Sequence, residues 1–121
     1  MQVNVHGRNI EVTADLIAHV ERRLGFALVR FGRRIARVAV RLLDVNGPRG
    51  GVDKRCCVDV SLIPVGKVYM EDADADLYVA VDRAADRVGR AVGRRFERER
   101  EFDAEVARTK RRFTTWRGHL S

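Results

Sequence analysis

At residues 35–45 the chain reads IARVAVRLLDV, and this stretch decides the fold that we expect. Val38, Val40 and Leu42 alternate with small or basic residues, which predicts a β-strand from about Ile35 to Val45 with one apolar face. Other elements must cover that apolar face, and the segments before and after this strand supply them.

Upstream, the sequence predicts a short strand and a helix. Val3 and Val5 alternate with polar residues until the turn at residues 7–9. Thr13 is a suitable N-cap and Asp15 falls in the positive first turn of the following helix, which should end near Gly32. Apolar residues recur there at steps of three and four, namely Ile17, Val20, Leu24, Leu28 and Phe31.

Downstream, the sequence predicts two more strands and a second helix. Residues 46–51 are rich in glycine and must form a loop, residues 55–62 alternate, and Pro64 with Gly66 turns the chain into a fourth strand around Val68 and Met70. Asp74 or Asp76 can cap the last helix. One side of that helix carries Leu77, Val81, Ala84, Val88, Ala91 and, as its single charged member, Arg95.

Together these elements predict an α+β fold of order βαβββα, a four-stranded sheet with both helices packed on one face. A chain of 121 residues with 45% apolar residues suits one domain with its own core. We expect that domain to span residues 1–101. Residues 102–121 show no steady period, and we expect a basic tail whose order the sequence leaves open.

The composition favours a polyanionic partner. Lys and Arg number 24 against 17 Asp and Glu, which gives a net charge of +7. No run reaches the roughly 20 apolar residues of a membrane span and no signal peptide is evident, so we expect a cytoplasmic protein without a membrane partner. Cys56 and Cys57 are neighbours that would point to opposite faces of a strand, so reduced thiols are expected.

Arginines gather on the outer side of both predicted helices. On the second helix Arg83, Arg87, Arg90 and Arg94 share one sector that contains no acid. The predicted RNA-binding residues are these four, Arg95 and Arg98 on the same helix, and Arg22, Arg23, Arg30, Arg33 and Arg34 on or just after the first. The alternative is an ordinary solvated face, since Glu97, Glu99 and Glu101 interleave with arginines further along.

Two further features leave alternatives open. The segment 46–55 could present Arg49, Lys54 and Arg55 to a phosphate or could be a plain hairpin loop, and it lacks the spacing of a Walker loop. Phe26 and Val29 point outward on the first helix. They are ordinary surface residues, a base-stacking platform or a protein contact such as a weak homodimer face.

The sequence gives no support for a metal site, a cofactor, a small-molecule substrate or catalysis. The cysteines and the three histidines lack the paired short spacings of a zinc site. Serine occurs only at Ser61 and Ser121, so a Ser-His-Asp arrangement would have to use a mid-strand residue or the last one. We therefore expect a binding protein and no enzyme.

Three stretches resemble a known family. They are VHGRNIEVT at residues 5–13, the helix that ends in Phe31 before Arg34 and Ile35, and DLYVAVD at residues 76–82. In this order they are similar to the ribosome hibernation promoting factors, also called ribosome-associated inhibitor A or sigma-54 modulation proteins. The resemblance covers about residues 1–100.

The resemblance implies a bacterial, ribosome-associated translation inhibitor that acts in stress response and stationary phase. Such a protein would bind ribosomal RNA of the small subunit in the channel for messenger and transfer RNA. By position, the resemblance passes the RNA contacts to Arg22, Arg23 and Arg30 on the first helix and to Arg83, Arg87, Arg90 and Arg94 on the second. The residues after Glu101 are too few for the dimerisation domain of long members, so we expect a short form. Phe26 replaces a common lysine, and the loop at residues 46–51 is longer than in the best-known short forms. The alternative is a diverged paralogue that serves as a protein-interaction or homodimerising module.

Overall fold

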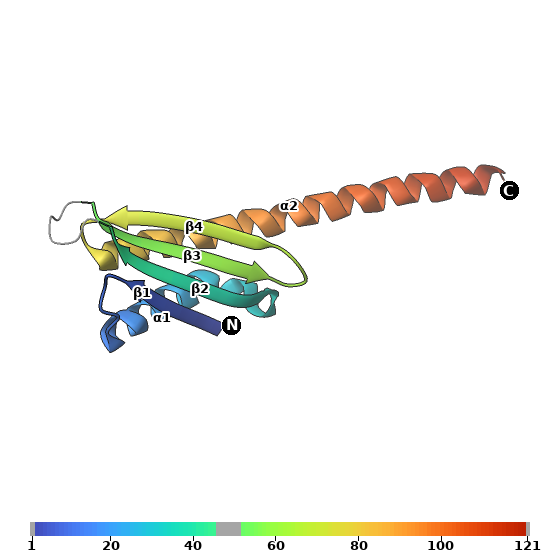
Figure 1. Ribbon diagram of the computed structural model, residues 1–121. Coiled ribbons are helices and arrows are strands. Elements are labelled where there is room, and N and C mark those ends of the chain that lie inside the picture. The colour runs from blue at the N-terminus through green and yellow to red at the C-terminus, as the bar shows by residue number, and fades with distance from the viewer. Residues whose placement is uncertain (1, 46–51, 121) are drawn as a thin grey trace. The chain divides into compact units, whose positions relative to one another are not determined.

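The computed structural model describes residues 2–45 and 52–120, with side chains in the second range up to Arg111. Its elements follow the predicted βαβββα order, with one additional 3-10 segment after the first helix (Figure 1). They are β1 (Gln2–Arg8), α1 (Ala14–Leu28), η1 (Val29–Arg34), β2 (Ile35–Asp44), β3 (Lys54–Leu62), β4 (Lys67–Asp74) and α2 (Leu77–Leu120). The predicted α+β class is confirmed.

The four strands form one mixed sheet in the order β1-β2-β3-β4. β1 runs parallel to β2, while β2 with β3 and β3 with β4 are antiparallel. A parallel pair needs a crossover connection, which α1 supplies. α1 and the first part of α2 lie on the same face of the sheet, as predicted (Figure 1).

The core lies between that face and the two helices. β2 and β3 bury alternate residues, which Val40 and Val58 exemplify, and these two pair directly across the strands. α1 buries Leu16, Val20, Leu24 and Leu28 toward the core. Complete burial of such a side chain contributes roughly 1.5–3 kcal/mol relative to exposure, so this layer provides most of the stability of the fold.

Both helices begin at the predicted caps. The Thr13 hydroxyl accepts a hydrogen bond from the Leu16 amide at 3.2 Å. The Asp76 carboxylate accepts from the Tyr78 amide at 2.9 Å, and Asp74 in turn accepts from the Asp76 amide at 2.9 Å. Asp76 is therefore the cap of α2, and Asp74 holds the residue that caps it.

The predicted end of the first helix near Gly32 was wrong. The α-helix stops at Leu28, and η1 follows with a break at Gly32, whose φ of 52° and ψ of −126° are not helical. This positive φ is strained for a residue with a Cβ atom, which accounts for glycine here. Arg33 and Arg34 consequently belong to η1 and lead directly into β2.

α2 continues beyond the predicted limit near Glu101 and is helical to Leu120. The chain forms two compact units, Met1–Ala91 and Val92–Ser121. The first unit contains the sheet and α1, and the division at residue 101 stays a prediction. Within the described ranges, every helix is too short or too polar to cross a membrane.

Candidate nucleic-acid interface

α1 and α2 approach each other closely at one glycine. A Cβ atom built on Gly89 would lie 3.1 Å from the carbonyl oxygen of Ala27 and 3.3 Å from the Ala27 Cβ atom. Because Gly89 has no side chain, the two backbones can pass at this distance. Gly89 therefore allows α1 and α2 to pack closely beside the arginines that flank this point, Arg30 and Arg90.

A polar cluster joins the helices beside this crossing. His19 Nε2 and Arg23 Nε lie 2.7 Å and 3.1 Å from the same carboxylate oxygen of Asp82. Arg23 Nη2 lies a further 3.3 Å from Asp86, and the His19 ring packs edge-on against Tyr78 at 4.8 Å between centroids. Arg23, which the sequence assigns to RNA, therefore also holds α1 against α2.

Arg30 lies across the same crossing. Its Nη2 atom donates to the carbonyl oxygen of Gly89 at 3.5 Å, and its guanidinium lies 4.6 Å from the centroid of the Phe31 ring. Both contacts are weak, and the side chain is exposed. Arg30 is thus oriented by the fold and still accessible to a ligand.

Arg83 and Arg87 of α2 face acids of β4. Arg83 Nη1 lies 3.2 Å from Asp74, and Arg87 Nη1 lies 3.4 Å from Asp72 while donating to the Glu71 carbonyl at 3.2 Å. The sector is free of acids along the helix, as the sequence indicates, but the neighbouring strand supplies them. Exposed pairs of this kind contribute about 0–1 kcal/mol, so a phosphate can compete for both arginines.

Other predicted arginines have no such partner among the described residues. In the first unit Arg22, Arg33 and Arg90 are exposed and make no ion pair, hydrogen bond or ring contact there. The same holds for Arg94 and Arg98 in the second unit. These side chains are therefore the strongest candidates for phosphate contacts.

Two predicted arginines are already engaged. Arg95 pairs with Glu99 at 3.7 Å within α2. Arg34 has partners of its own, and its carbonyl oxygen accepts from the Ile63 amide at 2.8 Å. Both are weaker candidates than the unpartnered arginines.

Two of the three residues predicted to contact phosphate from the loop, Lys54 and Arg55, already pair with acids of the protein. Lys54 Nζ bridges Asp53 at 2.9 Å and Asp44 at 3.1 Å, and these hydrogen bonds raise the pKa of Lys54. Arg55 Nη1 lies 3.9 Å from Glu71. Arg49 lies outside the described residues. The structure therefore gives Lys54 a structural role at the base of the loop.

Phe26 and Val29 are exposed on α1, at 81% and 71% of their surfaces. Phe26 is one helical turn after Arg22 on α1, and Arg30 follows in η1 after the α-helix ends. An exposed ring beside an arginine suits base stacking, and an exposed apolar pair equally suits a protein contact.

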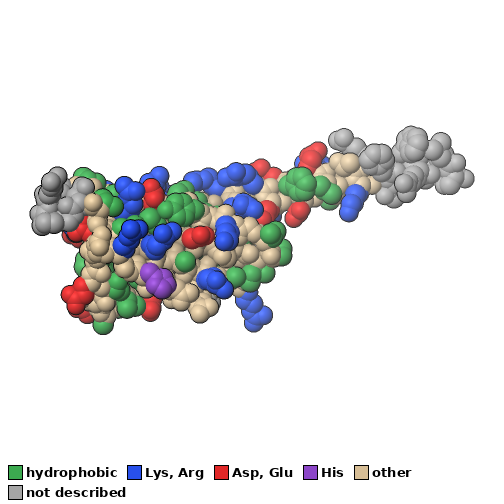
Figure 2. Space-filling view, viewed as in Figure 1, with side chains coloured by type: hydrophobic (Ala, Val, Ile, Leu, Met, Phe, Trp, Pro, Cys, Tyr) green, Lys and Arg blue, Asp and Glu red, His purple; other side chains and the backbone are tan. Residues whose placement is uncertain are grey.

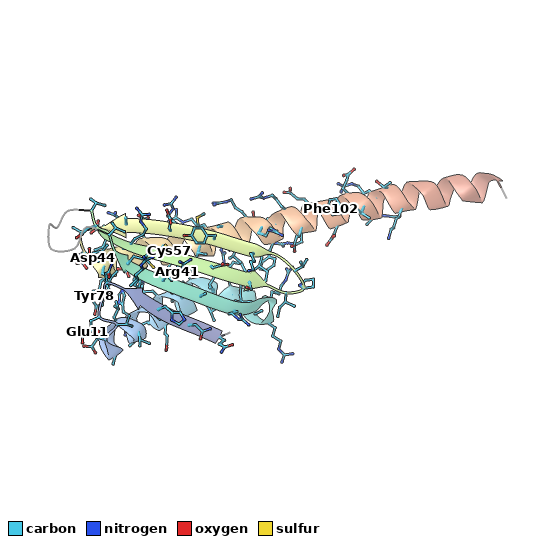
Figure 3. The ribbon with its side chains drawn as sticks, viewed as in Figure 1. Glu11, Arg41, Asp44, Cys57, Tyr78 and Phe102 are labelled. Carbon is cyan, nitrogen blue, oxygen red and sulfur yellow. The ribbon has the colours of Figure 1, made fainter. Side chains whose placement is uncertain are left out.

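The cysteines are free thiols on opposite faces of β3. Burial raises the pKa of Cys56, on the helix side, to about 12. Cys57 lies on the other face, where its thiol donates to Glu71 at 3.6 Å (Figure 3). The described side chains include no cluster of three or more His, Cys, Asp or Glu that could hold a metal.

Sequence reasoning overlooked the open face of the sheet, opposite the helices. Arg37 and Arg41 of β2 alternate with the buried Val38, Val40 and Leu42 and are exposed. Figure 2 shows Lys and Arg side chains spread across this side of the molecule. The alternation in residues 35–45 indicates this face, because Arg37 and Arg41 occupy the positions between the apolar ones.

The chain is similar to known ribosome-associated proteins. A family model described as sigma 54 modulation protein / S30EA ribosomal protein matches residues 3–100. A protein of Deinococcus radiodurans named ribosome hibernation promotion factor is 37% identical over 90 residues. That alignment covers 71% of this chain and 44% of the relative, so the chain spans less than half of the relative's length.

Solved structures share the fold. The N-terminal domain of Thermus thermophilus Protein Y superposes with a TM-score of 0.62 at 33% identity, covering 77% of this chain and 93% of that domain. A ribosomal subunit interface protein from Coxiella burnetii superposes with a TM-score of 0.66. The latter is 15% identical and covers 80% and 99% of the two chains, which supports the fold alone.

Proposed function

Because the chain belongs to the family described as sigma 54 modulation protein / S30EA ribosomal protein, we propose that it is a ribosome hibernation factor. It binds ribosomal RNA of the small subunit in the channel for messenger and transfer RNA and inhibits translation in the cytoplasm of a bacterium. The name of the Deinococcus radiodurans relative supports this assignment.

One observation carries the proposal at the level of residues. Arg22, Arg33 and Arg90 are exposed cations with no partner among the described residues. Guanidinium groups bind phosphates through paired hydrogen bonds, and such unpaired arginines lose no internal contact when they do so.

The mechanism is occupancy without chemistry. The arginines hold the domain against RNA phosphates, and its bulk excludes transfer RNA from the channel. Binding releases counterions from the RNA, so salt should weaken it steeply. No bond is made or broken in this scheme, and inhibition is reversed when the protein dissociates.

Sedimentation with purified small subunits tests the proposal. The wild type should pellet with subunits at low salt, and the double variant Arg22→Glu, Arg90→Glu should remain in the supernatant. The double variant Lys67→Glu, Arg108→Glu makes the same change in net charge away from the helix crossing and should pellet like the wild type. Absence of wild-type binding even at low salt would refute the function.

The exposed Phe26 and Val29 favour a second candidate, a homodimerising or protein-interaction module. It predicts a stable dimer in light scattering that Phe26→Asp dissociates, together with subunit binding that Arg22→Glu and Arg90→Glu leave intact. A monomer at all concentrations would eliminate the homodimer.

A further inference from the structure

The open face of the sheet consists of every second residue of each strand. The helices cover the opposite face (Figure 1). The strand register aligns these residues in four rows from β1 to β4: Gln2-Arg37-Ser61-Lys67, Asn4-Ala39-Asp59-Tyr69, His6-Arg41-Cys57-Glu71 and Arg8-Leu43-Arg55-Ala73.

Positive charge is concentrated on one half of this face. β1 and β2 contribute Arg8, Arg37 and Arg41 and no acid, whereas the two acids, Asp59 and Glu71, lie on β3 and β4. The three arginines are exposed and make no ion pair with any residue that the structure describes.

The acid nearest to Arg41 in its row is already engaged. Glu71 accepts from the Tyr69 hydroxyl at 2.9 Å and from the Cys57 thiol at 3.6 Å, and it lies 3.9 Å from Arg55. The β3–β4 half therefore balances its own charges, and the β1–β2 half does not.

Stability of the sheet does not explain these arginines. Oppositely charged cross-strand pairs stabilise a sheet, but the direct neighbours of Arg41 are His6 and Cys57. Asp59, opposite Ala39, lies diagonal to Arg37 and Arg41 and forms no ion pair with either. Charged residues on edge strands prevent aggregation, which could explain Arg8 on β1. β2 is an interior strand with a partner on each side, so that reason does not apply to Arg37 and Arg41.

We propose that Arg8, Arg37 and Arg41 form a second RNA-backbone site, the sheet site, on the face opposite the helices. Arg37 and Arg41 are separated by about 13 Å along β2, and Arg8 extends the line on β1, so phosphates along one RNA strand can engage them. The inference rests on the proposed function and deepens it. The domain would be held between two RNA surfaces, one against the helices and one against the sheet.

Fluorescence anisotropy with a labelled oligouridylate, followed by sedimentation with small subunits, tests the sheet site in the 121-residue chain. Arg37→Glu, Arg41→Glu should weaken both interactions about tenfold or more at low salt. The control Arg100→Glu, Arg108→Glu makes the same change in net charge on α2, away from the sheet, and should stay within about twofold of the wild type. Thermal unfolding followed by circular dichroism identifies any variant that fails to fold, in which case Arg37→Gln, Arg41→Gln replaces it.

A measurement without substitutions keeps the test independent of folding. Arginine modification by phenylglyoxal, followed by mass spectrometry, should show Arg37 and Arg41 protected in the subunit complex. If they stay reactive and the sheet variant binds like the wild type while Arg22→Glu, Arg90→Glu does not bind, the sheet site is wrong and the proposed function stands. If the wild type binds neither RNA nor subunits, both are wrong.

Discussion

Arginines of one helix differ in what they can give to a ligand, and acids on other elements make the difference. Arg87 faces Asp72 of β4, whereas Arg90 of the same helix has no partner among the described side chains. Arg23 meets Asp86 across 63 positions of sequence. An arginine that is already paired with an acid contributes less to the free energy of phosphate binding, because that pair must first be broken.

This difference predicts unequal effects of single substitutions. Arg90→Ala should weaken RNA binding by about 1 kcal/mol or more. Arg87→Ala should weaken it by clearly less, because Arg87 must give up its ion pair with Asp72 before it can bind a phosphate and therefore contributes less to affinity. Anisotropy titrations of both variants with the same RNA measure the order. Equal losses would mean that the ion pair of Arg87 opens at no cost.

The buried thiol of Cys56 predicts a pH-dependent stability. Its pKa is about 12 in the folded protein because of burial, against roughly 8.5 in an unfolded chain. Folding therefore favours the protonated thiol, and this contribution is complete below pH 8.5 and declines as pH rises toward 12.

Urea unfolding of the wild type and of Cys56→Val from pH 7 to pH 10.5 measures the effect. The free energy of unfolding of the wild type should fall relative to the variant above about pH 8.5, by up to about 1.4 kcal/mol per pH unit. Parallel curves throughout this range would show that the thiol ionises equally in both states.

Local features of single residues are predictable from the sequence and distant ones are not. Thr13 and Asp76 act on amides within three residues, so their capping roles follow from type and position. The pairing of Asp72 with Arg87 depends on how β4 docks beside α2, and no local pattern encodes that. The sequence therefore predicts the candidate arginines, while the docking of β4 and of the two helices determines which of them already pair with an acid.

At the level of elements, the crossing of α1 and α2 depends on Gly89. Gly25 on α1 has open space around its missing side chain, whereas a Cβ atom at Gly89 would press on Ala27. Two substitutions of the same kind should therefore have different results.

Gly25→Ala should stabilise the protein by about 1 kcal/mol, because alanine is the better helix former. Gly89→Ala should give less or none of this gain, since the new methyl group displaces the backbone of α1. Thermal and urea unfolding of both variants measure the difference. An equal gain at both positions would show that the helices separate without cost.

The length of α2 shows what periodicity misses. Apolar spacing predicts a helix as far as one face is buried, and residues 101–111 are exposed all round. Glu, Arg, Ala and Lys are strong helix formers, and Glu105 pairs with Arg108. Propensity and pairs along the helix sustain this segment without an apolar stripe.

For the whole molecule, positive charge on two opposite faces predicts how salt acts. Each lost phosphate contact should lower the slope of log affinity against log salt by about one. The helix variant Arg22→Glu, Arg90→Glu and the sheet variant Arg37→Glu, Arg41→Glu should each lower the slope by about two, and their combination by about four. Subunit sedimentation across a salt series measures this. If the combined variant lowered the slope no more than the helix variant does, RNA would contact only the helix face.

The position of β1 in the sheet affects the order in which the strands pair during folding. β2, β3 and β4 form two successive hairpins, whereas β1 pairs with β2 alone, and the register joins Gln2 to Arg37. Contacts between distant positions require closure of a longer loop and form more slowly. Pairing of β1 is thus expected to follow formation of the two hairpins, and until β1 pairs, β2 exposes an unpaired edge to which a second chain could add.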